Sequence, residues 1–336
     1  MEFGIFDHVE RRGADAAAVY RDRLALLRAA DEAGYFCYHA AEHHGTPLSL
    51  APSPALLLAA AATVTSRIRL GPLCYVLPLY DPLRLIEEVC MLDQLSGGRL
   101  ELGIGRGVSS VEMNFFGIEM EESRSRFEET LAILLRGLSE EELSHEGEHF
   151  SYDRVPMALA PLQRPHPPIW YPTSNLESVP FVAAQGYHTI FQGSLERVAA
   201  QVESYHAHAA GELAGRKIGL LRFVVVAADD RTAYERADRA LAAHLAHLDY
   251  LSHWQGAKRT ISRVRNVTLP EDAAQAVASG WGAIGSPETV IEQIAAMREA
   301  TGCNYLVYNP LLGETPLAEG LEAVERFAGE VLPALA

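Results

Sequence analysis

Cysteine, positive charge and long apolar runs are all scarce in this sequence of 336 residues. It has four cysteines and no Cys-x-x-Cys pair, so neither a disulfide framework nor a cysteine zinc site is expected. Lys and Arg number 28 against 44 Asp and Glu, and a surface of that charge repels nucleic acids and anionic lipids. The most apolar segment, Pro54 to Val64, is too short to span a bilayer. We expect a cytoplasmic globular protein that binds neither nucleic acid nor membrane.

Short apolar runs alternate with longer helical patterns along the whole chain. Eight runs have the length and composition of strands. Such an alternation predicts parallel strands joined by helical crossovers. The predicted strands are Glu2–Asp7, Tyr35–Ala40, Ile68–Leu77, Arg99–Ile104, Pro168–Pro172, His188–Phe191, Leu221–Ala227 and Asn304–Tyr308.

The turn after the first predicted strand distinguishes two ways of arranging these strands. An open doubly wound sheet usually has a glycine-rich turn there, whereas this chain has Phe6-Asp7-His8-Val9. We therefore predict an α/β fold of the (β/α)₈ TIM-barrel type with insertions, in one domain over residues 1–336. Residues 139–163 alternate like a hairpin packed outside the barrel. Residues 252–285 form a stretch long enough for a loop or lid.

Polar residues follow several of the predicted strands. Active sites of such barrels lie at the carboxyl ends of the strands, so these residues are expected to converge on one face. They are Asp7 and His8 after the first strand, Glu42, His43 and His44 after the second, Arg106 between glycines after the fourth, and Ser174, Asn175 and Ser178 after the fifth.

The Glu42-His43-His44 cluster has more than one interpretation. Adjacent histidines on a loop cannot easily reach one ion, and no third ligand has a recognisable spacing, so no metal site is predicted. A structural role stays open. We favour contact with a substrate or cofactor, because imidazole titrates near neutral pH and is suited to proton transfer.

Arg106 and the serines near residue 175 are candidates for an anion site. Glycine allows a ligand to approach the backbone closely, and arginine offers a planar fork for phosphate. Ser174, Asn175 and Ser178 precede a predicted helix, whose free N–H groups favour an anion. Simple helix capping explains the same residues, so both interpretations stay open.

The predicted helices over residues 54–66 and 82–95 are apolar on more than one face. An outer barrel helix needs only one apolar stripe. A second covering surface is therefore expected, either a second copy of the chain or the chain's own insertion.

Several segments resemble the bacterial luciferase-like flavin monooxygenases. The resemblance lies in Ala41-Glu42-His43-His44-Gly45, in LGPLCYVLPLYDPLRLIEEVCMLDQLSGGRLELGIGRG, in FFGIEMEESRSRFEET and in the late GSPETVIEQI. It covers most of the chain and is weakest between Ser252 and Gly280. It implies a (β/α)₈ barrel, usually dimeric through its second and third helices, that uses reduced FMN and oxygen.

The resemblance also implies roles for individual residues. His43 matches the histidine that serves the flavin–oxygen chemistry, and Glu42 precedes it as in the family. Leu73 and Cys74 fall where the third strand passes the flavin ring, often through a cis peptide bond. The residues implied to bind the FMN phosphate are Arg106, Arg124, Ser174, Asn175 and Ser178.

Two departures from the family pattern limit the reaction that is expected. Luciferase carries a reactive cysteine where this chain has Gly105, and the loop Tyr171 to Asn175 also differs. Oxidation of a small organic molecule other than a long-chain aldehyde is therefore expected, with reduced FMN supplied by a separate flavin reductase. The alternatives are hydride transfer with a deazaflavin and flavin binding without catalysis.

Overall fold

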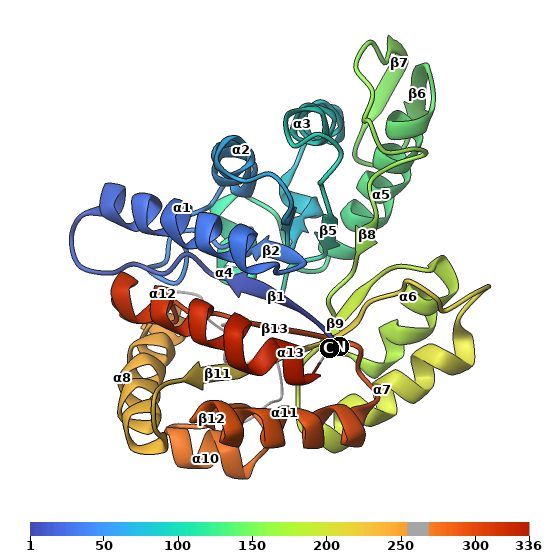
Figure 1. Cartoon of the computed structure of the whole chain (residues 1–336). Helices are drawn as coiled ribbons and strands as arrows, with labels where there is room; N and C mark the ends of the chain where they lie inside the picture. Colours follow the sequence, from blue (N-terminus) through green and yellow to red (C-terminus); the bar gives the residue numbers. More distant parts are fainter. Residues whose placement is uncertain (254–268, 336) are drawn as a thin grey trace.

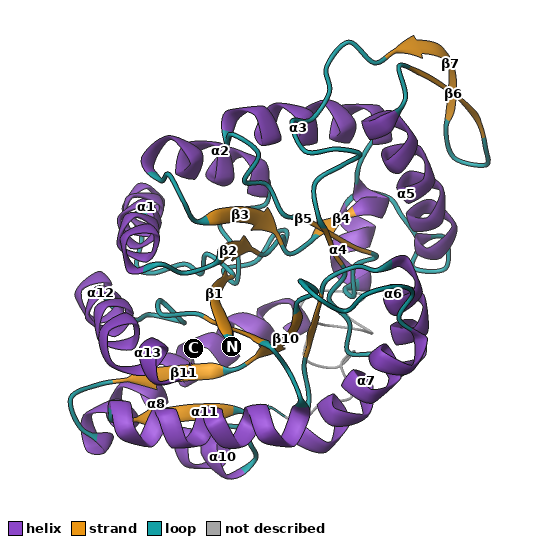
Figure 2. Ribbon diagram, turned by 45° about the vertical axis from the view of Figure 1, so that its right-hand side comes forward, coloured by secondary structure: helices purple, strands orange, loops and turns teal. Residues whose placement is uncertain are grey.

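The computed structural model describes residues 1–253 and 269–335. Parallel strands occupy the centre of the molecule, and helices form a layer around them (Figures 1 and 2). The α/β class that the alternating pattern predicts is therefore confirmed.

The largest sheet has six parallel strands and forms half of a barrel. The first strand of the chain lies in its middle and pairs with the last strand, with Glu2 opposite Tyr305 and Ile5 opposite Tyr308. In sheet order the strands are β3 (Arg69–Pro72), β2 (Cys37–Ala40), β1 (Glu2–Asp7), β13 (Tyr305–Tyr308), β10 (Ile218–Leu221) and β9 (Thr189–Phe191).

A second parallel sheet continues from the edges of the first. It contains β4 (Tyr75–Val76), β5 (Leu102–Gly105) and β8 (Ile169–Trp170). Isolated parallel bridges pair Leu70 with Leu100 and Trp170 with His188. The parallel half-barrel is thus an observation, while the closed eightfold barrel stays a prediction.

The helices begin and end with the local signals expected from the sequence. Asp15 accepts a hydrogen bond from the N–H of Ala17, and Gly34 ends the first helix with a φ of 83°, a conformation that glycine adopts without strain. The long helices are α1 (Ala16–Ala33), α2 (Pro54–Val64), α3 (Pro82–Leu95), α5 (Ser123–Ser139), α7 (Leu195–His208), α8 (Asp230–Asp249), α11 (Pro287–Thr301) and α12 (Leu317–Arg326). The short ones are η1 (Leu77–Leu79), α4 (Ser110–Phe115), η2 (Leu176–Ser178), α6 (Val179–Gln185), η3 (Tyr250–His253), α10 (Ala273–Ala278), η4 (Phe327–Val331) and α13 (Leu332–Leu335).

A buried carboxylate ties the first strand to its neighbours. Asp7 accepts hydrogen bonds from Arg23 Nε at 2.9 Å, from the Tyr38 hydroxyl at 2.9 Å and from Asn309 Nδ2 at 3.2 Å. Arg23 and Asp7 are both fully buried, and a buried ion pair is tolerated only with such additional hydrogen bonds. This group joins β1 to α1, to β2 and to the segment after β13.

The third predicted strand, Ile68–Leu77, is interrupted in the structure. β3 ends at Pro72, and the chain resumes as β4 at Tyr75. A cis peptide bond joins Leu73 to Cys74, at the position where the family resemblance implied one.

The seventh predicted strand, Leu221–Ala227, is placed wrongly. The strand of the central sheet is β10, which ends at Leu221, and residues 223–226 form β11 (Phe223–Val226). β11 pairs with β12 (Gly282–Gly285) in a separate parallel sheet. An alanine-rich cluster packs α8 and α10 against this pair, with Ala237, Ala240 and Ala276 in it. We call this unit, residues 223–249 and 273–285, the side sheet.

The two predicted insertions contain regular structure. Within residues 139–163, β6 (Glu142–Glu146) and β7 (Ser151–Pro156) form an antiparallel hairpin at the edge of the molecule (Figure 1). The predicted lid over residues 252–285 lies partly outside the described residues, since residues 254–268 are not among them. Its described part carries α10 and β12 instead of one continuous loop.

Candidate active site

A cavity of about 1050 Å³ lies at the carboxyl ends of the central strands. Residues at or directly after the ends of β1, β2, β3, β5, β8, β9 and β10 line it, which is the position of active sites in barrels of this type. The structure brings all nine predicted site residues to this cavity: Glu42, His43, Leu73, Cys74, Arg106, Arg124, Ser174, Asn175 and Ser178.

His43 is held by a carboxylate that sequence reasoning missed. Its Nδ1 atom lies 3.3 Å from both carboxylate oxygens of Glu112, and the backbone N–H of His44 donates to the same carboxylate at 3.2 Å. Glu112 lies on α4, whose N-cap Ser109 accepts from the Glu112 N–H. The Ser-x-x-Glu spacing of a capping box was a signal for this helix start, but nothing in the sequence indicates its partner.

Glu42 faces its own loop and the neighbouring strand. Its carboxylate is buried and accepts hydrogen bonds from the Val76 N–H at 3.2 Å and the Tyr80 hydroxyl at 2.8 Å, and it lies 2.9 Å from His44 Nε2. Burial and the Glu42 charge together raise the pKa of Tyr80, so Tyr80 keeps its proton and remains a donor. Glu42 therefore holds the loop that carries His43 against β4.

Cys74 and Gly105 share one small space in the cavity wall. A Cβ atom built on Gly105 would lie 2.3 Å from Cys74 Sγ. The thiol of Cys74 thus occupies the space next to the position where luciferase has its cysteine. Burial raises the pKa of Cys74, and Glu42 raises it further. The sulfur is therefore a neutral thiol near pH 7.

Three arginines line one part of the cavity. Arg106 donates to Ser123 Oγ at 3.4 Å, and Arg124 lies 3.7 Å from Glu128 at the exposed rim. The third, Arg197 on α7, donates to the carbonyl oxygen of Ser174. Sequence reasoning missed Arg197, because a single arginine on a predicted outer helix carries no motif.

The predicted phosphate loop is partly occupied by its own capping contacts. Asn175 Oδ1 accepts from the Glu177 N–H at 3.1 Å, and the Ser178 N–H donates to the Asn175 carbonyl at 3.2 Å. The side chains of Ser174, Asn175 and Ser178 still line the cavity beside Arg197. The cations and this helix start together favour an anionic group.

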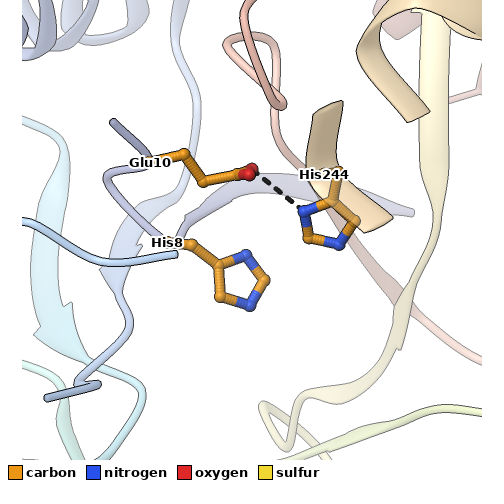
Figure 3. Close-up of side chains that lie close together, drawn as sticks. All are labelled: His8, Glu10 and His244. Atoms are coloured by element: carbon orange, nitrogen blue, oxygen red, sulfur yellow. Dashed lines mark hydrogen bonds and ion pairs between the residues drawn. The ribbon is translucent and has the colours of Figure 1, made fainter. Parts of the chain in front are cut away.

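Three buried groups beyond the cavity wall have the donor set of a metal site. Atoms of His8, Glu10 and His244 lie within 4.8 Å of one another (Figure 3). Glu10 already accepts from His244 Nδ1 at 3.0 Å, from His247 Nδ1 at 2.8 Å and from the Gly313 N–H at 2.9 Å. The His8 ring stacks at 5.8 Å on the ring of His43, so this cluster adjoins the cavity.

The fold and this site agree with comparisons to known proteins. Residues 1–304 match the sequence profile of the luciferase-like monooxygenases. The chain belongs to this family. The match extends from β1 through the whole cavity wall to the residue before β13.

Several solved and curated proteins that are similar to this chain are described as oxygenases. A flavin-dependent trigonelline monooxygenase, oxygenase component, of Acinetobacter baylyi is 32% identical over 190 residues, which are 55% of this chain and 52% of that protein. The crystal structure of monooxygenase RslO1 from Streptomyces bottropensis is 28% identical, with a TM-score of 0.86 and complete coverage of both chains. The oxygenating constituent of 3,6-diketocamphane monooxygenase of Pseudomonas putida, solved with FMN, has a TM-score of 0.83 at 22% identity, over 100% of this chain and 99% of that one.

The sequence has few long apolar runs, and the described helices are consistent with this. None of them is both long enough and apolar enough to cross a membrane.

Proposed function

We propose that this protein is a monooxygenase that uses reduced FMN and oxygen to oxidise a small organic substrate, with the reduced flavin supplied by a separate reductase. The observation that carries the proposal is the cavity of about 1050 Å³, which combines a histidine–carboxylate pair with a group of arginines. Membership of the luciferase-like family supports it. A relative described as an oxygenase component supports a separate source of reduced flavin.

The residues of the cavity fit FMN. Arg106, Arg124 and Arg197 would hold the phosphate, together with the loop from Ser174 to Ser178, because a phosphate binds to a planar fork and to a helix start. Leu73 and Cys74 would contact the flavin ring. Reduced FMN, when bound, supplies the electrons that activate oxygen.

His43 would hold or move a proton beside the reacting atoms. Its Nδ1 atom is engaged by Glu112, which leaves Nε2 as the ring nitrogen available to substrate or cofactor. A carboxylate behind a histidine fixes the tautomer and orientation of the ring and stabilises its protonated form. Glu42 would act as a positioning residue for this loop.

The arrangement of strands supports a closed ring as the frame of the site. The bridges from Leu70 to Leu100 and from Trp170 to His188 would join the two sheets at both edges. We therefore propose that the half-barrel is part of a closed (β/α)₈ barrel, which forms one domain.

A homodimer through α2 and α3 is part of the proposal. Leu56, Met91 and Leu95 on these helices are 75%, 55% and 58% exposed, which is unusual for three large apolar side chains on adjacent helices. A second copy would cover them. A Leu56→Glu variant should run as a monomer in sedimentation, whereas an unchanged mass for this variant contradicts the interface. A cytoplasmic location fits the free thiols of all four cysteines.

The deciding experiment mixes the purified protein with reduced FMN or with a reduced deazaflavin and then admits air. Binding of FMN, with an oxygenated product formed from a member of a substrate panel, supports the monooxygenase. Binding of the deazaflavin alone moves the protein to hydride transfer. A His43→Ala variant should lower turnover by roughly 10²–10⁴-fold with little change in FMN affinity, and unchanged turnover would refute the role of His43.

A further inference from the structure

A second, smaller pocket of about 30 Å³ adjoins the main cavity. The two share Phe6, Gln192 and Leu221 in their linings, so the two spaces lie next to each other along these residues. The rest of its wall combines apolar and aromatic side chains, Phe223, Leu248, Leu269, Trp281 and Leu312, with the polar or charged His8, Arg222, His244 and Asn309. Of these residues, Phe223, His244, Leu248 and Trp281 belong to the side sheet.

Arg222 is the charged residue in this wall that lacks an anionic partner. It lies between β10 and β11 and is only 2% exposed. Its Nη1 donates to the Leu221 carbonyl at 2.8 Å and its Nη2 to the Gly193 carbonyl at 3.0 Å, while Nε has no partner among the residues that the structure describes. Within residues 1–253 and 269–335, no carboxylate lies within ion-pair distance of it.

The other fully buried arginine shows what a structural arginine looks like in this protein. Arg23 is 1% exposed and forms an ion pair with Asp7 at 2.9 Å. Among the described residues, Arg222 contacts two carbonyl oxygens and the face of Trp281, whose ring centroid is 5.3 Å away. Residues 254–268 contain no Asp or Glu, so the sequence there offers no carboxylate either. An unpaired buried charge is costly, and its presence beside a pocket indicates a ligand of opposite charge.

Arg222 keeps its charge under ordinary conditions. Burial lowers the pKa of Arg222 to about 10, which leaves the guanidinium protonated near pH 7. Burial also strengthens its attraction for an anion, because the surroundings screen the charge weakly.

The same charge argues against a metal ion at the neighbouring histidines. His8 and His244 line the pocket together with Arg222, and two cations in so small a space repel each other. Glu10 is in addition fully engaged by His244, His247 and Gly313. The small pocket is therefore suited to an anion.

We propose that the small pocket is the carboxylate subsite of the substrate, in which Arg222 binds the carboxylate of a small organic acid with an aromatic or apolar body. The inference rests on the proposed function and adds the class of substrate. A carboxylate is planar and matches the guanidinium fork. The volume of about 30 Å³ favours this small group over a phosphate. Phe6 and Leu221, at the junction of the two spaces, would contact the apolar body.

Equilibrium binding of simple probes to the full-length protein tests this proposal. Benzoate, benzamide and benzenesulfonate are titrated calorimetrically, without FMN and with saturating oxidised FMN. The variants are Arg222→Met, which removes the charge, and Arg239→Met, a control on the surface of α8 where Arg239 pairs with Glu319. Thermal unfolding checks that both variants are folded. Arg222→Lys, which keeps the charge and loses the fork, is a second variant.

Benzoate should bind at least about tenfold more tightly than benzamide, as expected for one charge-assisted contact. Arg222→Met should weaken benzoate about 30-fold and leave benzamide nearly unchanged, and Arg222→Lys should fall between. Arg239→Met should bind benzoate and benzamide with the same affinities as the parent protein. Equal binding of benzoate and benzamide, or equal benzoate binding by Arg222→Met, overturns the proposal. Tighter binding of benzenesulfonate overturns the carboxylate class.

Binding of FMN is measured separately on the same samples by flavin fluorescence. If FMN binds and benzoate does not, the carboxylate subsite is wrong while the proposed function stands. If benzoate binds through Arg222 and FMN does not, the flavin function is wrong while the anion subsite stands.

Discussion

The Nδ1 atom of His43 lies at the same distance, 3.3 Å, from both carboxylate oxygens of Glu112. Glu112 therefore restrains the orientation of the His43 ring through Nδ1. We therefore expect Glu112 to act as a positioning residue, through its contact with His43.

Replacement of Glu112 should impair catalysis more than binding. Glu112→Ala removes the group that orients the His43 ring, so turnover should fall about 10- to 100-fold, while FMN affinity changes little. The pH profile of turnover should change shape, which loss of packing alone would not cause. Glu119→Gln, in the exposed turn after α4, is the control. A Glu112→Ala enzyme with the parent's turnover and pH profile would contradict this role.

Arg197 should distinguish FMN from riboflavin. Its contact with the Ser174 carbonyl places a cation beside the proposed phosphate loop. Arg197→Met should weaken FMN binding about tenfold or more, the expected loss of one charge-assisted contact. Riboflavin, which lacks the phosphate, should bind equally to both proteins in a fluorescence titration. An equal loss for the two ligands would indicate a change in the fold of the cavity instead.

Gly105 should tolerate a side chain only when Cys74 is shortened. A Cβ atom there would lie 2.3 Å from Cys74 Sγ, so Gly105→Ala should lower the free energy of unfolding by about 1–3 kcal/mol. In a Cys74→Ala background the same change should cost less, because the opposing sulfur is gone. Urea unfolding of the four proteins measures the coupling as a double-mutant cycle. Additive effects would show that Cys74 is not the obstacle.

Acid should destabilise the protein through Glu10. Burial by itself would raise the pKa of Glu10, but the charge and hydrogen bond of His244 and the hydrogen bond of His247 lower it well below its usual range. A carboxylate with a lowered pKa contributes stability above its unfolded value, near 4.3, and this contribution is lost as the pH falls below that value. The melting temperature of the parent should therefore drop steeply below about pH 4.5.

The Glu10→Gln variant isolates that contribution. It should be less stable at pH 7, because the histidine pair loses its charge partner, and its melting temperature should depend less on pH between about 3 and 5. The comparison is Glu129→Gln, which disrupts the pair between Glu129 on α5 and His145 on β6 of the hairpin. If Glu10→Gln keeps the parent's full acid dependence, the effect belongs to other carboxylates.

The sequence predicts strand positions best where an apolar run forms a single strand of the central sheets. Seven of the predicted runs overlap strands of the central sheets, since their apolar residues are buried there. The segment Phe223–Val226 is a better strand by composition than Ile218–Leu221, which contains a glycine. Composition does not tell which sheet a strand joins, and this is why the seventh strand was placed wrongly.

The residues of the candidate site also differ in how well the sequence predicts them. Residues in local motifs, such as His43 and Arg106, line the cavity as expected. Glu112 lies 69 residues from its partner His43, and Arg222 has no motif at all. Their importance comes from burial and from what is near them, and both depend on how distant segments pack together.

The side sheet has its own alanine-rich core and meets the central strands at Arg222. Part of the wall that would select the substrate, at Phe223 and Trp281, thus belongs to the side sheet, whereas His43 and Arg106 follow strands of the central sheets. Substitutions in Phe223 or Trp281 can reshape the small pocket and leave the His43 side of the main cavity unchanged. Under the proposed function, substitutions in the side sheet alone would then change substrate preference.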